Sequence, residues 1–268
     1  MNILDGKITS QEILKELKEK IEKNNISPIL DMIMIGDNPA SAKYTSMKQI
    51  TGKSIGINGT IHRLSADTKE SEVIALIHKL NRDPKITAIM VQLPLPDNFD
   101  EQKIINTIDP HKDADGLTAQ NLGLLFQKDE KALVSATPLG IITMLQKYNI
   151  DLCGKNAVII NRSPFIGLSL AALFINANAT VTVCHSRTKN TLELCQAADI
   201  IVAGTGKPNY LKADYVKEGA IVIDVGIEVD FENVKNKCSY ITPGIGGVGP
   251  MTVSSLLANT VKIALNKL

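Results

Sequence analysis

The sequence predicts an α/β protein with two domains, each built around a largely parallel sheet. Short apolar runs alternate with helical patterns along most of the 268 residues, as is typical of strand–helix–strand crossovers. This length exceeds one average domain. The alternation is briefly interrupted near residues 134–137, so we place the domain boundary there, with a first domain at 1–135 and a second at 136–268.

The composition is that of an ordinary soluble globular protein, with 44% hydrophobic residues, 21% charged residues and a formal net charge of +1. No block of like charge predicts a nucleic-acid surface, and no run of about 18 apolar residues predicts a membrane span. We therefore expect a cytoplasmic protein without nucleic-acid or membrane partners. The four cysteines and four histidines lack the spacing of disulfide frameworks or metal ligands, so we expect reduced thiols and no metal.

Two helices of the first half have recognisable beginnings. Residues 9–23 carry apolar side chains on one face, and Thr9 and Glu12 form the T-x-x-E pattern of a capping box. Residues 38–54 begin with Asn38-Pro39, an N-cap side chain followed by a proline suited to the first helical turn. We predict helices over both ranges.

Buried strands are predicted from short apolar runs bounded by glycine, proline or polar residues. These runs lie at residues 29–35, 60–64, 86–92, 157–160, 179–183, 200–203 and 220–225. Further helices are predicted at residues 71–80, from Thr137-Pro138 onward, and after Gly249-Pro250, where an apolar-periodic stretch closes the sequence.

The turn after the strand at 157–160 is a candidate dinucleotide site. A dinucleotide pyrophosphate sits on the backbone amides of a helix N-terminus that directly follows such a strand. The turn lacks the full G-x-G-x-x-G pattern, so a plain strand-to-helix turn is the alternative. The candidate cofactor-binding residues here are Asn161, Arg162, Ser163 and Gly167.

The next strand ends in Ser186 and Arg187, about twenty residues beyond Gly167, where an NAD site usually places an acidic residue. A hydroxyl and a guanidinium at this point, together with Arg162, would donate to a 2′-phosphate. This favours NADP over NAD. The alternative is an arginine on a solvated turn.

Glycines follow the later strands of the second half. Ligands in open α/β sheets collect at the carboxyl ends of strands, which is where Gly204, Gly206 and Gly226 lie. Gly246 and Gly247 belong to a glycine-dense stretch before the last helix, which suggests either close approach to a ligand or a flexible hinge.

Four polar side chains of the first half form a candidate substrate site. Tyr44 and Lys48 are four residues apart on a predicted helix and so share a face. Gln92 ends a predicted strand, and Asp115 lies in a turn. Converging in one site, these groups would suit a polar heteroaromatic substrate. The alternative is a surface lysine lying along an aromatic ring.

Five motifs together closely resemble the bifunctional methylenetetrahydrofolate dehydrogenase/cyclohydrolase family, in the family's order between Asn38 and Thr260. They are Tyr44-x-x-x-Lys48, Val91-Gln92-Leu93-Pro94-Leu95-Pro96, Lys112-Asp113-Ala114-Asp115-Gly116, Thr137-Pro138-Leu139-Gly140 and Gly246-Gly247-Val248-Gly249-Pro250-Met251-Thr252.

The resemblance implies an N-terminal α/β folate-binding domain and a C-terminal Rossmann-type domain. It also implies a homodimer and a final helix, residues 250–268, that packs back onto the first domain. The activity implied is NADP-dependent oxidation of 5,10-methylenetetrahydrofolate followed by hydrolysis of the methenyl product. Lys48 would serve hydrolysis, Gln92 would support Lys48, Tyr44 would lie against the substrate's aromatic portion, and Asp115 would hold the pterin. Further substrate contacts are implied at Val91, Leu93, Gly246, Gly247 and Pro250, and cofactor contacts at Gly204, Gly206, Gly226, Ile227 and Thr252.

The sequence departs from the family pattern at several positions, which concern cofactor geometry more than substrate class. They are Asn161 for Gly, Ser169 for Pro, Ala136 for Cys, Leu117-Thr118-Ala119 for a stretch with His-Pro, Ile245 for Pro, and a shortened segment at 227–231. Two other hypotheses are a non-catalytic nucleotide- or folate-binding protein and a dehydrogenase of the shikimate or amino-acid type. Lys48 and Gln92 argue against the first, and the two long motifs at 91–96 and 246–252 disfavour the second.

Overall fold

The computed structural model describes residues 1–266; Lys267 and Leu268, the end of the predicted C-terminal helix, lie outside the described residues. Contacts divide the chain into two compact units. The six-stranded unit comprises Met1–Glu12, Leu125–Asp129 and Thr137–Ser255, and the three-stranded unit comprises Ile13–Leu124, Glu130–Ala136 and the chain from Leu256 onward. The predicted ranges 1–135 and 136–268 are simpler than this grouping and remain a prediction.

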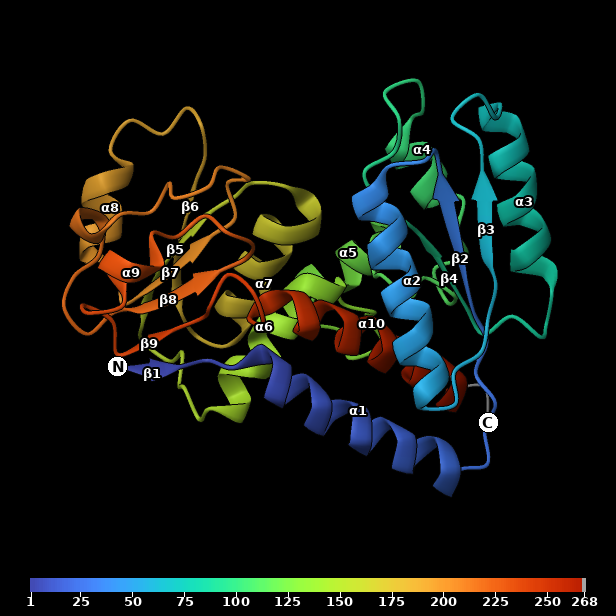
Figure 1. The fold of residues 1–268 in the computed structure, drawn as a ribbon, viewed down its shortest axis with the longest axis horizontal. Helices are drawn as coiled ribbons and strands as arrows, with labels where there is room; N and C mark the ends of the chain where they lie inside the picture. Colours follow the sequence, from blue (N-terminus) through green and yellow to red (C-terminus); the bar gives the residue numbers. More distant parts are fainter. Residues whose placement is uncertain (267–268) are drawn as a thin grey trace. The chain divides into compact units, whose positions relative to one another are not determined.

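The three-stranded unit holds a parallel sheet in the order β3-β2-β4, which confirms the three strands predicted there. The strands are β2 (Leu30–Ile35), β3 (Ile61–Leu64) and β4 (Ala88–Val91). One face packs on α3 (Glu70–Arg82) through a cluster that includes Ile33, Ile77 and Ile89. The other face carries Met90, which contacts α2 (Pro39–Ser54), so the sheet lies between these helices (Figure 1).

The predicted beginning of α2 is confirmed, and that of the first helix is wrong. The Asn38 side chain accepts hydrogen bonds from the Ala40 amide at 3.0 Å and the Ser41 amide at 3.1 Å. Helix α1 (Gly6–Lys23) begins before Thr9, whose hydroxyl donates to the Asp5 carbonyl at 2.7 Å. Asp5 caps this helix by accepting from the Ile8 amide at 2.9 Å, so the capping box is not formed.

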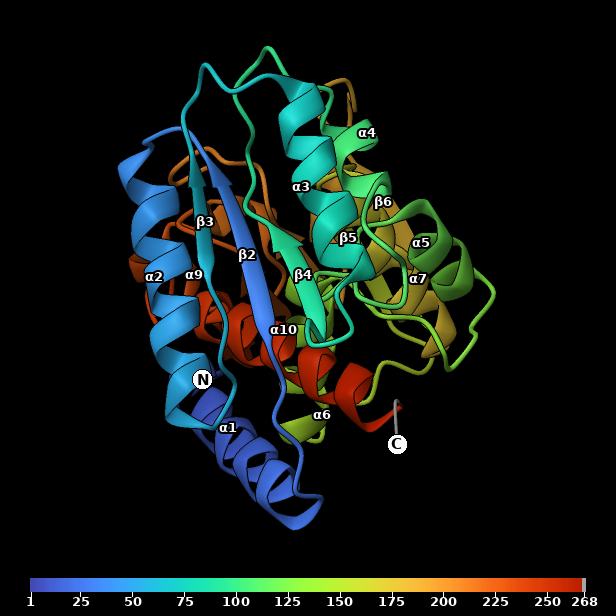
Figure 2. The same cartoon turned by 90° about the vertical axis from the view of Figure 1, so that its right-hand side faces the viewer.

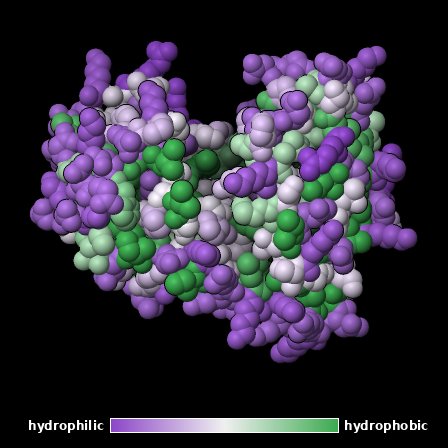
Figure 3. Space-filling model, in the orientation of Figure 1, coloured by the Kyte–Doolittle hydropathy of each residue, from purple (hydrophilic) through white to green (hydrophobic). Residues whose placement is uncertain are grey.

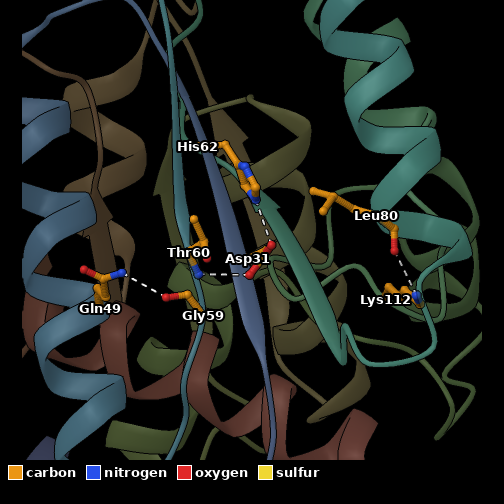
Figure 4. A network of polar contacts seen from close by, with 7 residues as sticks. All are labelled: Asp31, Gln49, Gly59, Thr60, His62, Leu80 and Lys112. Atoms are coloured by element: carbon orange, nitrogen blue, oxygen red, sulfur yellow. Dashed lines mark hydrogen bonds and ion pairs between the residues drawn. The ribbon is translucent and has the colours of Figure 1, made fainter.

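Buried polar side chains fix the strands and helix ends of the three-stranded unit (Figure 4). Asp31 on β2 accepts from the Thr60 amide at 2.9 Å and contacts the His62 ring at 2.7 Å, which ties β3 to β2. The Lys112 ammonium donates to the Leu80 carbonyl at 3.0 Å near the end of α3. A cation at that position satisfies carbonyls that the helix itself leaves free.

The six-stranded unit has a parallel sheet in the order β1-β9-β8-β7-β5-β6, which confirms the predicted α/β class. Its strands are β1 (Asn2–Ile3), β5 (Asn156–Ile160), β6 (Thr180–Cys184), β7 (Ile200–Ala203), β8 (Ile221–Asp224) and β9 (Tyr240–Ile241). The order reverses between β5 and β7, since β6 lies on one side of β5 and the later strands on the other. Such a reversal is where doubly wound sheets bind ligands.

Helices cover this sheet and connect its strands. They are α6 (Ala136–Lys147), a π-helical turn (Pro164–Leu168) leading into α7 (Ser169–Asn176), α8 (Thr191–Ala197) and α9 (Phe231–Val234). Helix α10 (Val248–Leu265) follows the last strand, and its residues from Leu256 onward belong to the three-stranded unit. Helix α10 begins at Val248 rather than after Pro250, because the first turn of a helix tolerates proline. Short elements were not predicted: strands β1 and β9, and helices α4 (Glu101–Asn106) and α5 (Ala119–Phe126).

Among the described residues, α10 is the one helix long and apolar enough to cross a membrane by length and composition. Most of it is buried, and the core helix of a soluble protein passes the same test.

Hydrophobic residues appear as small patches among hydrophilic ones on the face drawn in Figure 3. Three exposed hydrophobic side chains come from predicted site segments: Tyr44 is 40% exposed, Ile227 57% and Ile245 90%. Figure 2 shows α2 and β3 of the three-stranded unit from the side. The exposed fraction of Tyr44, a residue of α2, makes its ring accessible to a ligand.

All four cysteines are free thiols, and they differ in accessibility. Cys153 is exposed, whereas Cys184, Cys195 and Cys238 are buried. Burial raises the pKa of Cys195 to about 12 and that of Cys238 to about 11. We expect one thiol to react with a chromogenic disulfide reagent in the native protein and all four after unfolding. Rapid reaction of a second thiol under native conditions would contradict this burial.

Candidate active site

Lys48 lies in the middle of α2 and is only 5% exposed. Its Nζ donates to Gln92 Oε1 at 3.1 Å and contacts Met90 Sδ at 3.4 Å. Gln92 directly follows β4, so a helix face and a strand end converge on one buried amine. The alternative of a surface lysine lying along a ring is therefore wrong.

The Gln92 amide is held with its oxygen toward the amine. Its Nε2 donates to the Leu93 carbonyl at 2.7 Å, and Thr45 Oγ1 contacts its Oε1 at 3.4 Å. Thr45 is fully buried one helical turn before Lys48. Sequence reasoning missed Thr45, although helical spacing from Lys48 places it on the same face.

Asp115 is half-buried in a turn fixed by its neighbour Asp113. The Asp113 carboxylate accepts from the Gly116 amide at 2.9 Å and the Thr118 amide at 2.8 Å. Asn259 of α10 donates to the Ala114 carbonyl at 2.8 Å. Sequence reasoning missed the roles of Asp113 and Asn259 in fixing this turn. Asn259 is distant in sequence, and nothing in the motif distinguishes Asp113 from the other residues.

Lys48 and Asp115 influence each other's protonation. Burial lowers the pKa of Lys48, and the charge of Asp115 opposes this shift. Burial raises the pKa of Asp115, Lys48 opposes that shift and Asp113 adds to it. The amine is therefore more readily neutral than an exposed lysine, which suits a proton acceptor.

The other predicted substrate residues occur in both units. In the three-stranded unit, Val91 is 3% exposed within β4, and Leu93 is half-buried and precedes a cis-proline bond. In the six-stranded unit, Gly246 has a φ of +89°, which favours glycine. A Cβ on Gly247 would lie 2.3 Å from the Pro243 carbonyl oxygen, and Pro250 lies in the first turn of α10.

A cavity of about 310 Å³ lies at the reversal point between β5 and β7. Its lining includes the predicted cofactor residues Asn161, Arg162, Ser163, Ser186 and Gly204. It also includes Ile160, His185, Thr205, Lys207 and Tyr210, which were not predicted. Lys207 could have been found, because it is a basic residue directly after the Gly204–Gly206 pair at a strand end.

The donors around this cavity suit a dinucleotide. Two cations, Arg162 and Lys207, and the hydroxyls of Ser163, Ser186 and Thr205 line one space. Phosphate oxygens and ribose hydroxyls are recognised by such donors. The residues present therefore fit a phosphorylated cofactor.

The Asn161 side chain forms hydrogen bonds with backbone groups of the predicted phosphate site. Its Oδ1 accepts from the Ser163 amide at 2.8 Å and the Gly167 amide at 3.2 Å, and its Nδ2 donates to the Gly204 carbonyl at 2.6 Å. Two amides at this helix beginning are thus already engaged, contrary to the expectation that they face a ligand. Gly167 is required here, since a Cβ would lie 1.9 Å from the Asn161 carbonyl oxygen.

The remaining predicted cofactor residues are not in the cavity lining: Gly167, Arg187, Gly206, Gly226, Ile227 and Thr252. Arg187 is exposed, and its amide donates to His185 Nδ1 at 3.1 Å. Thr252 Oγ1 lies 3.0 Å from Thr137 Oγ1. The amides of Gly206 and Gly226 instead donate to Glu228.

Asp224 and Glu228 form a buried carboxyl pair, with exposures of 2% and 6%. Asp224 accepts from the Glu228 amide at 2.9 Å and the Val229 amide at 3.2 Å. Burial, and then a hydrogen bond with the Glu228 side chain, raises the pKa of Asp224 to about 7. Asp224 is therefore protonated below neutral pH.

This pair is expected to make folding stability depend on pH. The pKa of Asp224 is higher in the folded protein than its ordinary 3.8, so the stabilisation is full below that value and is lost as the pH rises through about 7. Because the pKa differs by about three units and each unit is worth about 1.4 kcal/mol, the free energy of unfolding should fall by on the order of 4 kcal/mol. Asp224→Asn, whose amide still donates to Glu228, should abolish the fall. Urea unfolding at several pH values measures it, and parallel curves for both proteins would contradict the assignment.

Among residues 1–266, no group of three or more histidine, cysteine, aspartate or glutamate side chains is placed to hold a metal ion.

Two family models match most of the chain. The tetrahydrofolate dehydrogenase/cyclohydrolase catalytic domain matches residues 4–115, and the NAD(P)-binding domain of the same family matches residues 135–268. The bifunctional protein FolD of Campylobacter curvus is 47% identical over 100% of this chain and 97% of its own length. The FolD protein of Lactobacillus helveticus is 49% identical over 97% of this chain and 96% of its own length.

Comparison with solved structures leads to the same family. The bifunctional FolD enzyme of Campylobacter jejuni has a TM-score of 0.97 at 44% identity, covering 100% of both chains. The Trypanosoma brucei enzyme, complexed with NADP cofactor and inhibitor, has a TM-score of 0.94 at 31% identity, covering 98% of this chain and 97% of its own. Shikimate 5-dehydrogenase of Thermus thermophilus, at 16% identity and a TM-score of 0.53 over 89% of this chain and 100% of its own, shares the fold alone. The two domain models and these full-length relatives place the chain in the tetrahydrofolate dehydrogenase/cyclohydrolase family.

Proposed function

We propose that this protein oxidises 5,10-methylenetetrahydrofolate to the 5,10-methenyl compound with NADP and hydrolyses that product to 10-formyltetrahydrofolate. The single observation that carries the proposal is the buried Lys48 amine, held 3.1 Å from Gln92 Oε1 in a family member. We further propose that residues 1–135 bind folate and residues 136–268 bind the dinucleotide.

Hydrolysis needs a group that takes and returns a proton. Water attacks the cationic methenyl carbon, and neutral Lys48 accepts the proton that the water loses. As the carbon–nitrogen bond breaks, Lys48 returns that proton to the leaving ring nitrogen, and the hydroxyl group on the carbon loses its own proton to solvent as it becomes the formyl carbonyl. The amine is regenerated, and one proton is released for each cation hydrolysed. Gln92 Oε1 accepts from the ammonium form and orients it, while burial keeps the neutral form accessible by lowering the pKa of Lys48.

When bound, the nicotinamide cofactor accepts the hydride from the substrate methylene. Arg162, Ser186 and Lys207 would hold its phosphates and ribose, because they supply the charged and hydroxyl donors of the cavity. We propose NADP rather than NAD, since Ser186 and Arg187 lie in the turn after β6, where an NAD site usually places an acid. The protein's task in this step is alignment.

We also propose a cytoplasmic homodimer that needs no metal, acts on a tetrahydrofolate-derived small molecule, and has neither a nucleic-acid nor a membrane partner. These features follow from the composition and the family resemblance. Size-exclusion chromatography with light scattering measures the oligomer, and a monomer at micromolar concentration would contradict the dimer.

Assaying the two half-reactions separately tests the function. Methenyltetrahydrofolate without cofactor should be hydrolysed, and methylenetetrahydrofolate with NADP should yield reduced cofactor. A non-catalytic binding protein would do neither while still binding ligand. A dehydrogenase of the shikimate type would reduce NADP with shikimate and not with the folate.

A further inference from the structure

Glu228 is a buried acid that the proposed chemistry does not use. It lies in the short connection, residues 225–230, between β8 and α9. Its backbone carbonyl accepts from the Leu211 amide at 2.9 Å, and the adjacent Val229 pairs with Leu211 as an isolated parallel bridge. The connection is therefore fixed against the segment that follows the cavity loop.

Both carboxylate oxygens of Glu228 accept hydrogen bonds from backbone amides in loops at the carboxyl edge of the sheet. Oε1 accepts from Gly206 at 3.2 Å, and Oε2 accepts from Gly226 at 2.7 Å. A Cβ on Gly226 would lie 3.1 Å from Oε1, so the carboxylate occupies the space beside that glycine. Glu228 thus joins the turn after β7 to the turn after β8.

The turn after β7, residues 204–207, is one of the turns that face the cofactor cavity. Gly204, Thr205 and Lys207 line the cavity, whereas Gly206 does not. Asn161 holds this turn at one end by donating to the Gly204 carbonyl at 2.6 Å. Glu228 holds the other end through Gly206.

Gly206 has a φ of +70°, and a Cβ there would meet no atom within 4 Å. Glycine is conformationally permissive, so its own preference does not fix the turn. A hydrogen bond to an ionised acceptor is about twice as strong as a neutral one. Within the turn, the Lys207 amide donates to Thr205 Oγ1 at 3.1 Å, and contacts from Asn161 and Glu228 hold the turn to the rest of the unit.

We propose that Glu228 is a positioning residue for the dinucleotide, whose carboxylate holds residues 204–207 in the conformation that presents Thr205 and Lys207 to the cofactor. This rests on the proposed cofactor site. Glu228 does not line the cavity, so its effect on binding passes through the turn.

Glu228→Gln tests the proposal, because an amide offers one oxygen and turns an N–H donor toward the second amide donor. We expect the dissociation constant for NADP, measured by calorimetry, to rise about tenfold or more. The KM for NADP should rise with it, while kcat at saturating NADP and hydrolysis of methenyltetrahydrofolate without cofactor stay within about twofold. Glu228→Asp keeps the negative charge but shortens the side chain, so we expect the same rise in the dissociation constant for NADP. This variant replaces Glu228→Gln in the test if the glutamine variant does not fold.

Glu232→Gln is the matched control. It makes the same change on the exposed face of nearby α9, where Glu232 pairs with Lys235, and NADP binding should not change. Unchanged NADP affinity in folded Glu228→Gln and Glu228→Asp would overturn the inference, as would a loss of thermal stability without a change in affinity. If the unaltered protein binds no NADP, the proposed function itself fails and the inference with it; normal binding by all variants refutes the inference alone.

Discussion

The Lys48→Met variant is expected to lose cyclohydrolase activity by about a hundredfold or more while retaining substantial dehydrogenase activity. Methionine keeps the bulk of the side chain but removes the amine that contacts Gln92 Oε1. Hydride transfer requires alignment, whereas hydration of the methenyl cation requires a proton acceptor. The methenyl intermediate should therefore accumulate during turnover of methylenetetrahydrofolate.

Lys53→Met is the matched control, since Lys53 is an exposed lysine on the same helix, and neither activity should change. The hydrolysis rate of the unaltered protein should rise with pH through a pKa below the ordinary 10.5 of lysine, because burial lowers it and the neutral amine is the acceptor. If both activities of Lys48→Met fall together with weaker folate binding, Lys48 is a binding residue. Unchanged activities would mean that the amine has no role.

Arg162→Ala is expected to weaken NADP binding by about tenfold to a hundredfold and NAD binding much less. A hydrogen bond between a guanidinium and a phosphate is worth roughly 1.5 to 3 kcal/mol, and NAD lacks the 2′-phosphate. Arg162 lines the cavity together with Ser186, whereas Arg187 does not. Calorimetric titration with each cofactor measures the two constants.

Arg187→Ala is the matched comparison, because it removes the same group from the turn after β6. The sequence points to Arg187 first as the phosphate contact, whereas Arg162 is the arginine that lines the cavity. A selective loss in either variant supports phosphate recognition at this turn. Equal losses for NADP and NAD in both variants would show that neither arginine reads the phosphate.

The sequence predicted the elements whose signals are local. Asn38-Pro39 marks the beginning of α2 through groups within one turn, and apolar runs of four or more residues mark the longer strands. Thr9 and Glu12 gave a wrong helix beginning, because Asp5 competes as the cap. Strands β1 and β9 have two residues each, too few for a pattern, and exist through pairing with each other and with β8.

The residues of the candidate sites also fall into those that a sequence signal identifies and those that only the folded chain reveals. Lys48 and Gln92 could be named because motif and helical spacing point to them, although 44 positions separate them. The roles of Asp113 and Glu228 depend on which backbone amides the folded chain brings to their carboxylates, and no sequence spacing gives that. The hydrogen bonds of Asn161 could not be predicted from spacing either. Its side chain accepts from two backbone amides that the strand-to-helix pattern predicts to bind a phosphate.

The most direct test of the central claim is a time course of one reaction mixture containing the protein, methylenetetrahydrofolate and NADP. Absorbance follows reduced cofactor and the methenyl compound together, and chromatography measures 10-formyltetrahydrofolate. We expect one reduced cofactor for each 10-formyl product, and the concentration of the methenyl compound should rise briefly and then fall. Absence of cofactor reduction, or reduction with permanent accumulation of the methenyl compound beyond its uncatalysed hydrolysis, would contradict it.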